Sequence, residues 1–384
     1  MKEKESALYS SYIIDGYRCE GTPADLLDEC MESCIIPDDL PDFDDIVDES
    51  TEPPLSSFTY DSAHRDEYTA KTTAASSSER GFRMLYPDHF TRLHIAKTLL
   101  GRLWSEGHFR LGDLSVWAQW EWNTRPIGNM SAFYTSAKSA SEYLYGLGVT
   151  LSDYLFLESD ESSSAKFFAW LPEDIIETDE DNQEDILFKA SPYESSHPWI
   201  SDNRKCPGEM VADKDSWLIY IPFDTCAYKI GGSLLAEAYG HNGGIAPAIS
   251  DPDYFIDCYE VVRELTEDGI IMAGVTVADG GLATAAEKMR SGAGMDIDIS
   301  GIMSSYQEQD EIKVLFGEVP GVLIQISDEN YDYVDSQFLL QDIAYYPIGH
   351  PSEEHEGIRF TGRNRSGVAD ILASLMIQAT EGED

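Results

Sequence analysis

The chain has 384 residues, of which 42% are hydrophobic and 11% aromatic, enough to fill the cores of two domains and an appendage. Its formal net charge of −45 repels nucleic-acid phosphates and anionic membranes, so direct binding to either is not expected. No stretch approaches the roughly 20 apolar residues that a membrane helix needs.

The cysteines and the N-terminus indicate a reduced, cytoplasmic protein. The six cysteines lack the paired C-x2-C spacing of zinc sites. Cys30 and Cys34 are four residues apart, which predicts that they share a helix face. The first twenty residues lack the apolar core of a signal peptide. We therefore expect a cytoplasmic location.

Residues 1–62 form an acidic segment, with 17 Asp or Glu residues against three Lys or Arg residues. Such segments are often solvated arms, but apolar residues recur between positions 35 and 47. Two interpretations stay open: a solubilising arm, or an arm that docks as an extended or helical segment. Residues 50–80 are rich in Ser, Thr, Ala and Pro, which predicts a linker or an irregular outer layer. Residues 1–80 are thus an acidic arm and linker.

Residues 81–212 are predicted to form an N-terminal domain. Pro87 and Asp88 are typical of a first helical turn, and apolar residues then recur close to the 3.6-residue period. Gly148 is a plausible C-cap for a second helix. The predicted elements are a helix from 87 to 103, a strand over 114–122, a helix over 131–147, and strands over 149–157 and 166–171.

Residues 213–384 are predicted to form a second domain, in which strands and helices alternate. The alternation indicates an α/β or mixed α+β fold. The predicted strands cover 217–223, 270–277, 314–316, 322–326, 348 and 358–360. The predicted helices cover 234–239, 253–267, 282–289, 337–343 and 368–379.

Two glycine-rich turns stand between strands and helices of this second domain. Gly231, Gly232 and Ser233 precede one helix, and Asp279, Gly280 and Gly281 precede another. Glycine lets backbone N–H groups approach a phosphate closely, and a helix N-terminus adds a favourable dipole. Each turn has two interpretations, a phosphate cradle or a tight turn without a ligand.

These motifs, in this order, resemble the second half of large-type phosphoribosylformylglycinamidine (FGAM) synthase, a half similar to aminoimidazole-ribonucleotide (AIR) synthetase. The matching pieces are Gly231-Gly232-Ser233, PDYFIDCYEVVRELTEDGIIMAGVTVADGGL and KVLFGEVPGVLIQIS, preceded by the helix YPDHFTRLHIAKTLLGRLW and the pair Trp120 and Trp122. The likeness covers about residues 81–379. It implies a two-domain AIR-synthetase-like (PurM-like) half, with an N-terminal sheet-pairing layer and a C-terminal α/β domain.

The resemblance also implies ligands and chemistry. FGAM synthase uses ATP to phosphorylate an amide oxygen of its substrate, and ammonia then displaces the phosphate. The resemblance therefore implies ATP or ADP with Mg²⁺. The implied nucleotide-binding residues are Gly231, Gly232, Ser233, Asp279, Gly280 and Gly281. Asp279 and Glu318 are, as paired oxygen ligands, candidates for binding Mg²⁺. The alternative for that pair is an N-cap acid and a surface acid.

The chain departs from the family at several charged positions. Residues 152–157 (SDYLFL) stand where the family has a Gly-Lys-Asp-Ser phosphate motif, and Val275 and Thr276 stand where it has a His-Asp pair. Tyrosine and leucine cannot neutralise phosphate as lysine does. The chain also has no counterpart of the first half or of the Cys-His-Glu glutaminase domain, so no catalytic residue is assigned.

These departures lead to two hypotheses. In the first, the chain is a non-catalytic nucleotide-binding, partner-binding or assembly module whose N-terminal sheet contacts a protein partner or a second copy. In the second, it is an ATP-dependent FGAM synthase subunit, active only with a separate first half and a separate glutaminase. Large virion proteins built on this family exist, so a viral homologue that keeps the fold without catalysis would also fit.

Overall fold

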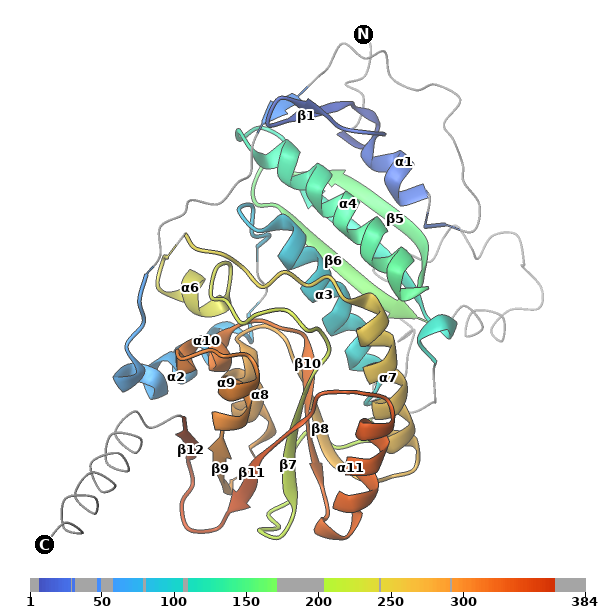
Figure 1. Cartoon of the computed structure of the whole chain (residues 1–384). Helices are drawn as coiled ribbons and strands as arrows, with labels where there is room; N and C mark the ends of the chain where they lie inside the picture. Colours follow the sequence, from blue (N-terminus) through green and yellow to red (C-terminus); the bar gives the residue numbers. More distant parts are fainter. Residues whose placement is uncertain are drawn as a thin grey trace, which may run out of the picture.

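The computed structural model describes residues 7–28, 30–31, 47–49, 58–78, 81–105, 110–170, 204–241, 243–290 and 292–362. It contains an N-terminal layer, a C-terminal layer built on a larger sheet, and a small N-terminal sheet (Figure 1). The predicted mixed α+β class is confirmed. The division at residues 80 and 212 stays a prediction.

The N-terminal layer is a three-stranded sheet covered on one face by two helices. Strand β4 (Ser115–Trp122) lies in the centre, parallel to β5 (Thr150–Glu158) and antiparallel to β6 (Ser164–Trp170). Helices α3 (Pro87–Arg102) and α4 (Asn129–Leu147) pack on it.

Alternation along β4 explains this packing, because every second side chain faces the helices. Trp120 and Trp122 are fully buried there. Their indole N–H groups donate to Ser136 Oγ at 2.9 Å and to the Asn129 carbonyl at 2.8 Å, respectively. The two tryptophans are therefore core residues.

The C-terminal layer is a six-stranded sheet in the order β12-β9-β11-β7-β10-β8. Its strands are β7 (Trp217–Pro222), β8 (Ile271–Val277), β9 (Gly294–Asp298), β10 (Gly321–Ile326), β11 (Tyr346–Ser352) and β12 (Ile358–Thr361). Its helices are α6 (Leu234–Ala238), α7 (Pro252–Glu267), α8 (Gly281–Met289), α9 (Ser300–Ser305), α10 (Glu311–Phe316) and α11 (Tyr331–Leu340).

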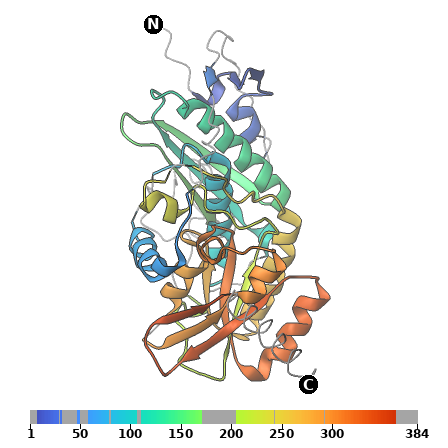
Figure 2. The same cartoon turned by 60° about the vertical axis from the view of Figure 1, so that its left-hand side comes forward.

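Period-2 alternation divides the buried side chains of this sheet between two cores. Ile219 and Ile324 join the core that contains α7 and the N-terminal layer. Leu218 and Leu323 join the core that contains α8 and α10. One core therefore runs continuously from the sheet into the N-terminal layer, and Figure 2 shows the two layers stacked.

One prediction for the C-terminal layer was wrong, and another had the wrong bounds. Residues 314–316, predicted as a strand, belong to helix α10, because Asp310 caps its first turn by accepting from the Ile312 amide at 3.0 Å. The helix predicted at 337–343 is α11, which ends at Leu340, and Asp342 has a left-handed φ of 56°. The predicted helix over 368–379 lies outside the described residues.

The predicted linker also contains a helix. Residues Arg65–Ala75 form α2, which packs on α6 and α8 of the C-terminal layer. Thr72 is fully buried, and its hydroxyl lies 3.0 Å from the Thr284 hydroxyl of α8. The prediction of a linker or irregular layer was wrong here because polar threonines, which the sequence presents as exposed, are buried through mutual hydrogen bonds.

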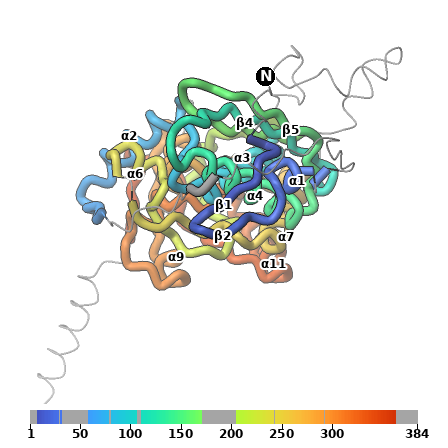
Figure 3. The backbone as a smooth tube through the Cα atoms, turned by 90° about the horizontal axis from the view of Figure 1, so that it is seen from above, coloured from blue at the N-terminus to red at the C-terminus, as the bar shows by residue number. Residues whose placement is uncertain are grey.

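The described part of the acidic arm is docked. It forms strands β1 (Tyr12–Ile14) and β2 (Tyr17–Arg18) and helix α1 (Pro23–Asp28), and β1 also pairs with β3 (Val47–Glu49). Figure 3 shows β1, β2 and α1 over α4. Tyr134 of α4 donates to the Glu20 carbonyl at 2.9 Å, and Tyr154 of β5 donates to Asp28 Oδ1 at 2.9 Å.

Two further expectations concern cysteines and membranes. Cys30 follows α1 and its thiol donates to the Ser141 carbonyl, whereas Cys34 lies outside the described residues. In the described part of the chain, no helix combines the length and the apolar character needed to cross a bilayer.

Replacing Trp122 with alanine should lower the free energy of unfolding by about 3–5 kcal/mol, because it leaves a cavity beside Phe82 and Phe133 and removes an indole hydrogen bond. Urea denaturation measures the change. The control is Ile127→Ala, at a side chain that is 93% exposed, which should shift stability by no more than about 0.5 kcal/mol. Equal effects of the two substitutions would contradict the assigned core.

Candidate functional site

The two glycine-rich turns adopt backbone conformations that require glycine. Gly280 has a φ of 79°, and a Cβ atom there would overlap with the Thr284 hydroxyl. Gly232 has a φ of 69°, and a Cβ atom would lie 2.7 Å from the Tyr86 ring. Both turns are therefore fixed as tight entries to α8 and α6.

Glu318 joins the two turns. One of its oxygens, Oε1, accepts from the backbone N–H groups of Leu234 and Gly280, both at 2.7 Å. The other, Oε2, accepts from Arg83 Nη1 at 2.6 Å. The side chain is fully buried, so Glu318 is not the surface acid of the alternative interpretation. Its carboxylate accepts hydrogen bonds from backbone amides at the starts of α6 and α8, which therefore cannot donate to a phosphate.

Arg83 is the buried counter-charge of this carboxylate. It lies just before α3, and its side chain is 7% exposed. Nη1 also donates to the Gly232 carbonyl, and Nη2 lies 3.6 Å from Asp279 Oδ1. The sequence analysis missed Arg83, because nothing local distinguishes it and Glu318 is 235 positions away in the chain.

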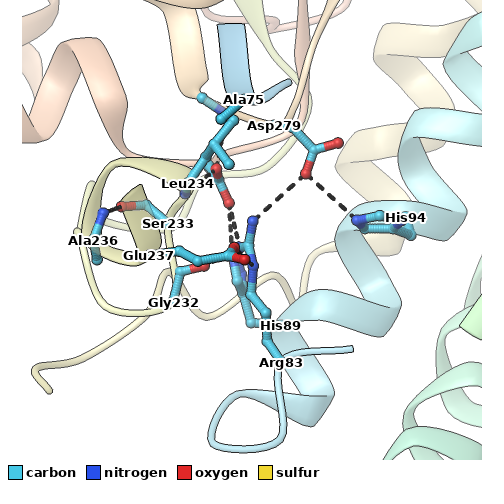
Figure 4. Close-up of polar contacts among 12 residues, drawn as sticks. Ala75, Arg83, His89, His94, Gly232, Ser233, Leu234, Ala236, Glu237 and Asp279 are labelled. Carbon is cyan, nitrogen blue, oxygen red and sulfur yellow. Dashed lines mark hydrogen bonds and ion pairs between the residues drawn. The ribbon is translucent and has the colours of Figure 1, made fainter. Parts of the chain in front are cut away.

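Asp279 is almost fully buried and faces cationic groups. Lys97 Nζ donates to Oδ2 at 2.7 Å, and His94 Nε2 lies 3.4 Å from Oδ1. His94 and Lys97 are three positions apart on α3, so they share a face of that helix. Figure 4 shows Asp279 between the Arg83 and His94 side chains, with Ser233 at the start of α6.

The donor set does not fit a Mg²⁺ ion shared by Asp279 and Glu318. A guanidinium contacts both carboxylates, and Glu318 already accepts three hydrogen bonds. Within the described ranges, no group of three or more His, Cys, Asp or Glu side chains could hold a metal ion. These contacts disfavour Mg²⁺ binding by Asp279 and Glu318, which stays an untested prediction.

The residues at the altered family positions have packing roles. Ser152 donates to the Val116 carbonyl at 3.1 Å, which supports the N-terminal sheet. Tyr154 holds the arm through Asp28. Val275 is buried, and the Thr276 hydroxyl accepts from the Trp104 indole N–H at 2.9 Å.

A cavity of about 280 Å³ lies beside Asp279, between the end of α2, one face of α3 and strand β6. It brings together two lysines, a histidine and several hydroxyl groups. The lining residues are Ser76, Ser78, Phe90, His94, Lys97, Thr98, Ser164, Ala165, Lys166, Phe167, Phe168 and Asp279. Such a set of donors suits an anion.

Several buried nitrogen atoms around this site have no hydrogen-bond partner. They are both ring nitrogens of His89, Nε2 of His94, and Nε and Nη2 of Arg83. All of these except His89 Nδ1 make longer contacts, of 3.4–3.9 Å, with nearby carboxylates. Buried polar groups are normally hydrogen-bonded, so orphaned nitrogens that cluster in one place indicate a ligand or an ordered water.

Lys288 adds to the positive charge near Asp279. Burial lowers the pKa of Lys288, and the charge of Lys97 lowers it further, whereas Asp279 raises it. The ammonium groups of Lys97 and Lys288 are thus close enough to repel each other. In a chain of net charge −45, this concentration of cations is a local exception.

The chain is similar in sequence to curated FGAM synthases. It is 23% identical to the probable phosphoribosylformylglycinamidine synthase, chloroplastic/mitochondrial, of Arabidopsis thaliana over 276 residues, which is 70% of this chain and 18% of that protein. It is 24% identical to the Drosophila melanogaster synthase over 277 residues, 69% of this chain and 19% of that protein. No family model matches.

These matches confirm the resemblance that the motifs indicated, and they show that the chain spans less than a fifth of the length of these relatives. Among solved structures, Thermotoga maritima PurL complexed with FGAR overlaps 72% of this chain and 41% of its own, with a TM-score of 0.49 and 10% identity. Escherichia coli HypE, a hydrogenase maturation protein, overlaps 71% and 77%, with a TM-score of 0.42 and 11% identity.

Replacing Glu318 with glutamine should lower the free energy of unfolding by about 3–5 kcal/mol, because Arg83 would remain buried without its nearest counter-charge. The matched control is Glu329→Gln, at an exposed position, which should leave stability nearly unchanged. Urea denaturation compares the two variants. A Glu318→Gln protein as stable as the control would contradict the linking role of Glu318.

Proposed function

We propose that the chain is an FGAM-synthase-like binding and assembly module that does not catalyse FGAM formation alone. It binds the phosphate groups of a nucleotide such as ADP or ATP in the cavity beside Asp279. The observation that carries the proposal is the set of basic side chains, Lys97, Lys166 and His94, that line this cavity beside Asp279 at the entry to α8.

The charges and shape of the cavity support an anionic ligand. Lys97 and Lys166 line it from α3 and β6, and hydroxyl groups of Ser76 and Thr98 complete its polar wall. Solved structures of Thermotoga maritima PurL are described as complexes with ATP, ADP and AMPPCP. The proposal extends nucleotide binding to this chain. The glycines contribute by fixing the turns around Glu318, because the Leu234 and Gly280 amides already donate to its carboxylate.

The proposal that the chain does not catalyse FGAM formation rests on the positions at which it departs from the family. Tyr154 and Thr276 stand at positions where the family resemblance implies charged groups, and both are engaged in intramolecular hydrogen bonds. Neither side chain can neutralise phosphate charge as lysine does. The synthase-subunit alternative is favoured by the intact turn at Asp279, and it requires partner chains to supply the missing groups.

Assembly is proposed through the sheet of the N-terminal layer, with a protein partner or a second copy. Among the described strands, β5 and β6 each pair only with β4, and the arm meets the outer edge of β5 where the Leu151 amide donates to the Cys30 carbonyl at 3.0 Å. We propose that the remaining strand edges are where another chain pairs. Leu157, near the end of β5, is 42% exposed. Open strand edges are templates for strand pairing. Native mass measurements on the purified chain, alone and in extract, distinguish pairing with a second copy from pairing with a different protein.

Isothermal titration calorimetry should detect ADP binding to the full chain. Replacing both Lys97 and Lys166 with alanine should weaken it roughly tenfold or more, since charge-assisted hydrogen bonds contribute about 1.5–3 kcal/mol each. The matched control is Lys138→Ala on α4, a lysine that pairs with Glu142 outside the cavity. Unchanged affinity in the double variant would place the ligand elsewhere.

The chain alone should produce no FGAM from FGAR, ATP, Mg²⁺ and ammonium. Free ammonium replaces the glutaminase, so the assay isolates the ligase step. Product formed by the chain alone would refute the non-catalytic proposal. Product that forms only when a separate first half is added would establish the synthase-subunit alternative instead.

A further inference from the structure

The charge of Asp279 is balanced by side chains of the protein. Lys97 Nζ lies 2.7 Å from Oδ2, and Arg83 Nη2 lies 3.6 Å from Oδ1. Each carboxylate oxygen therefore faces a fixed cation. A Mg²⁺ ion at about 2.1 Å from either oxygen would stand against one of these positive groups and be repelled by it.

Glu318, the second carboxylate of the predicted Mg²⁺ pair, is not available to complete a metal site there. Glu318 is fully buried and bonded to Arg83 and to two backbone amides. Taking it as a Mg²⁺ ligand would break hydrogen bonds in the interior of the protein, where their loss costs most.

We propose that this site uses Lys97 and Arg83 as built-in cations in place of Mg²⁺, so that it takes a phosphate-bearing ligand in its metal-free form. The inference rests on the proposed function and specifies its ligand class. Lys97 donates one hydrogen bond to Asp279, and an ammonium has three donors. Its side chain is 47% exposed and lines the cavity, so its remaining donors can reach a ligand.

Lys166 and His94 give this arrangement its preference for a free anion. Lys166 lines the same cavity from β6, and His94 lines it from α3, with its Nε2 3.4 Å from Asp279 Oδ1. Together with Lys97 they would recognise the full negative charge of a diphosphate. A Mg²⁺ ion bound to that diphosphate would cancel part of the charge and weaken the attraction.

The first test compares ADP binding to the full chain in EDTA and in excess Mg²⁺, by isothermal titration calorimetry. The expected result is equal or tighter binding in EDTA. Binding that requires Mg²⁺, or that tightens tenfold with it, would overturn the inference while leaving the proposed nucleotide binding intact.

The second test follows thermal unfolding with Mg²⁺ alone, so it does not depend on any nucleotide. Lys97→Glu places a carboxylate opposite Asp279 and should create a Mg²⁺ response, a rise in melting temperature of about 2 °C or more, that the unaltered chain lacks. Lys97→Gln is the matched control, because it removes the ammonium without adding an acidic ligand.

The two tests can fail separately. Stabilisation of the unaltered chain by Mg²⁺ would overturn the inference, and a Lys97→Glu protein that responds no more than Lys97→Gln would count against it. If ADP binds under neither condition while Lys97→Glu gains the Mg²⁺ response, the proposed function fails and the replacement of the metal by Lys97 holds.

Discussion

The buried ion pair between Arg83 and Glu318 organises the centre of the molecule. One carboxylate holds the entry amides of α6 and α8, and the guanidinium links it to the N-terminal layer. Burying a charge is costly unless it is paired and hydrogen-bonded, so each member fixes the position of the other. The pair thereby connects both glycine turns to the start of α3 and brings Arg83 within 3.6 Å of Asp279.

A second charge pair sets the chemistry next to it. Lys97 and Asp279 meet across α3 and the entry of α8, and the cavity begins at the exposed side of that lysine. In a chain with such an excess of acid, long-range repulsion would expel a second anion from most of the surface. The cluster of Lys97, Lys166 and His94 is what makes anion binding physically reasonable at this one place.

The sequence predicted local features well and pairings between distant residues poorly. Runs of apolar and β-favouring residues predicted β4 and β7, and glycine pairs predicted both turns, because these features depend on neighbouring residues. The segment at 314–316 was mistaken for a strand, since three apolar residues do not distinguish a buried helix from a strand. Arg83 and Lys97 were missed as site residues because their partners lie 235 and 182 positions away. The spacing of apolar residues along the chain carries no information about contacts between such distant residues.

Side chains at the positions that differ from the family resemblance have hydrogen-bond partners within the protein. Tyr154, in the segment that replaces the family's phosphate motif, now donates to Asp28 of the docked arm. Burial raises the pKa of Asp28, and the hydrogen bond from Tyr154 opposes that rise, so the bond stabilises the charged form where desolvation disfavours it. Thr276 likewise accepts from the Trp104 indole. A buried polar group that lacked a partner would cost stability, and these intramolecular hydrogen bonds avoid that penalty. Lys97 has a similar effect at Asp279: its ammonium donates to the carboxylate at 2.7 Å, so the buried acid at the entry to α8 has a counter-charge supplied by the protein itself.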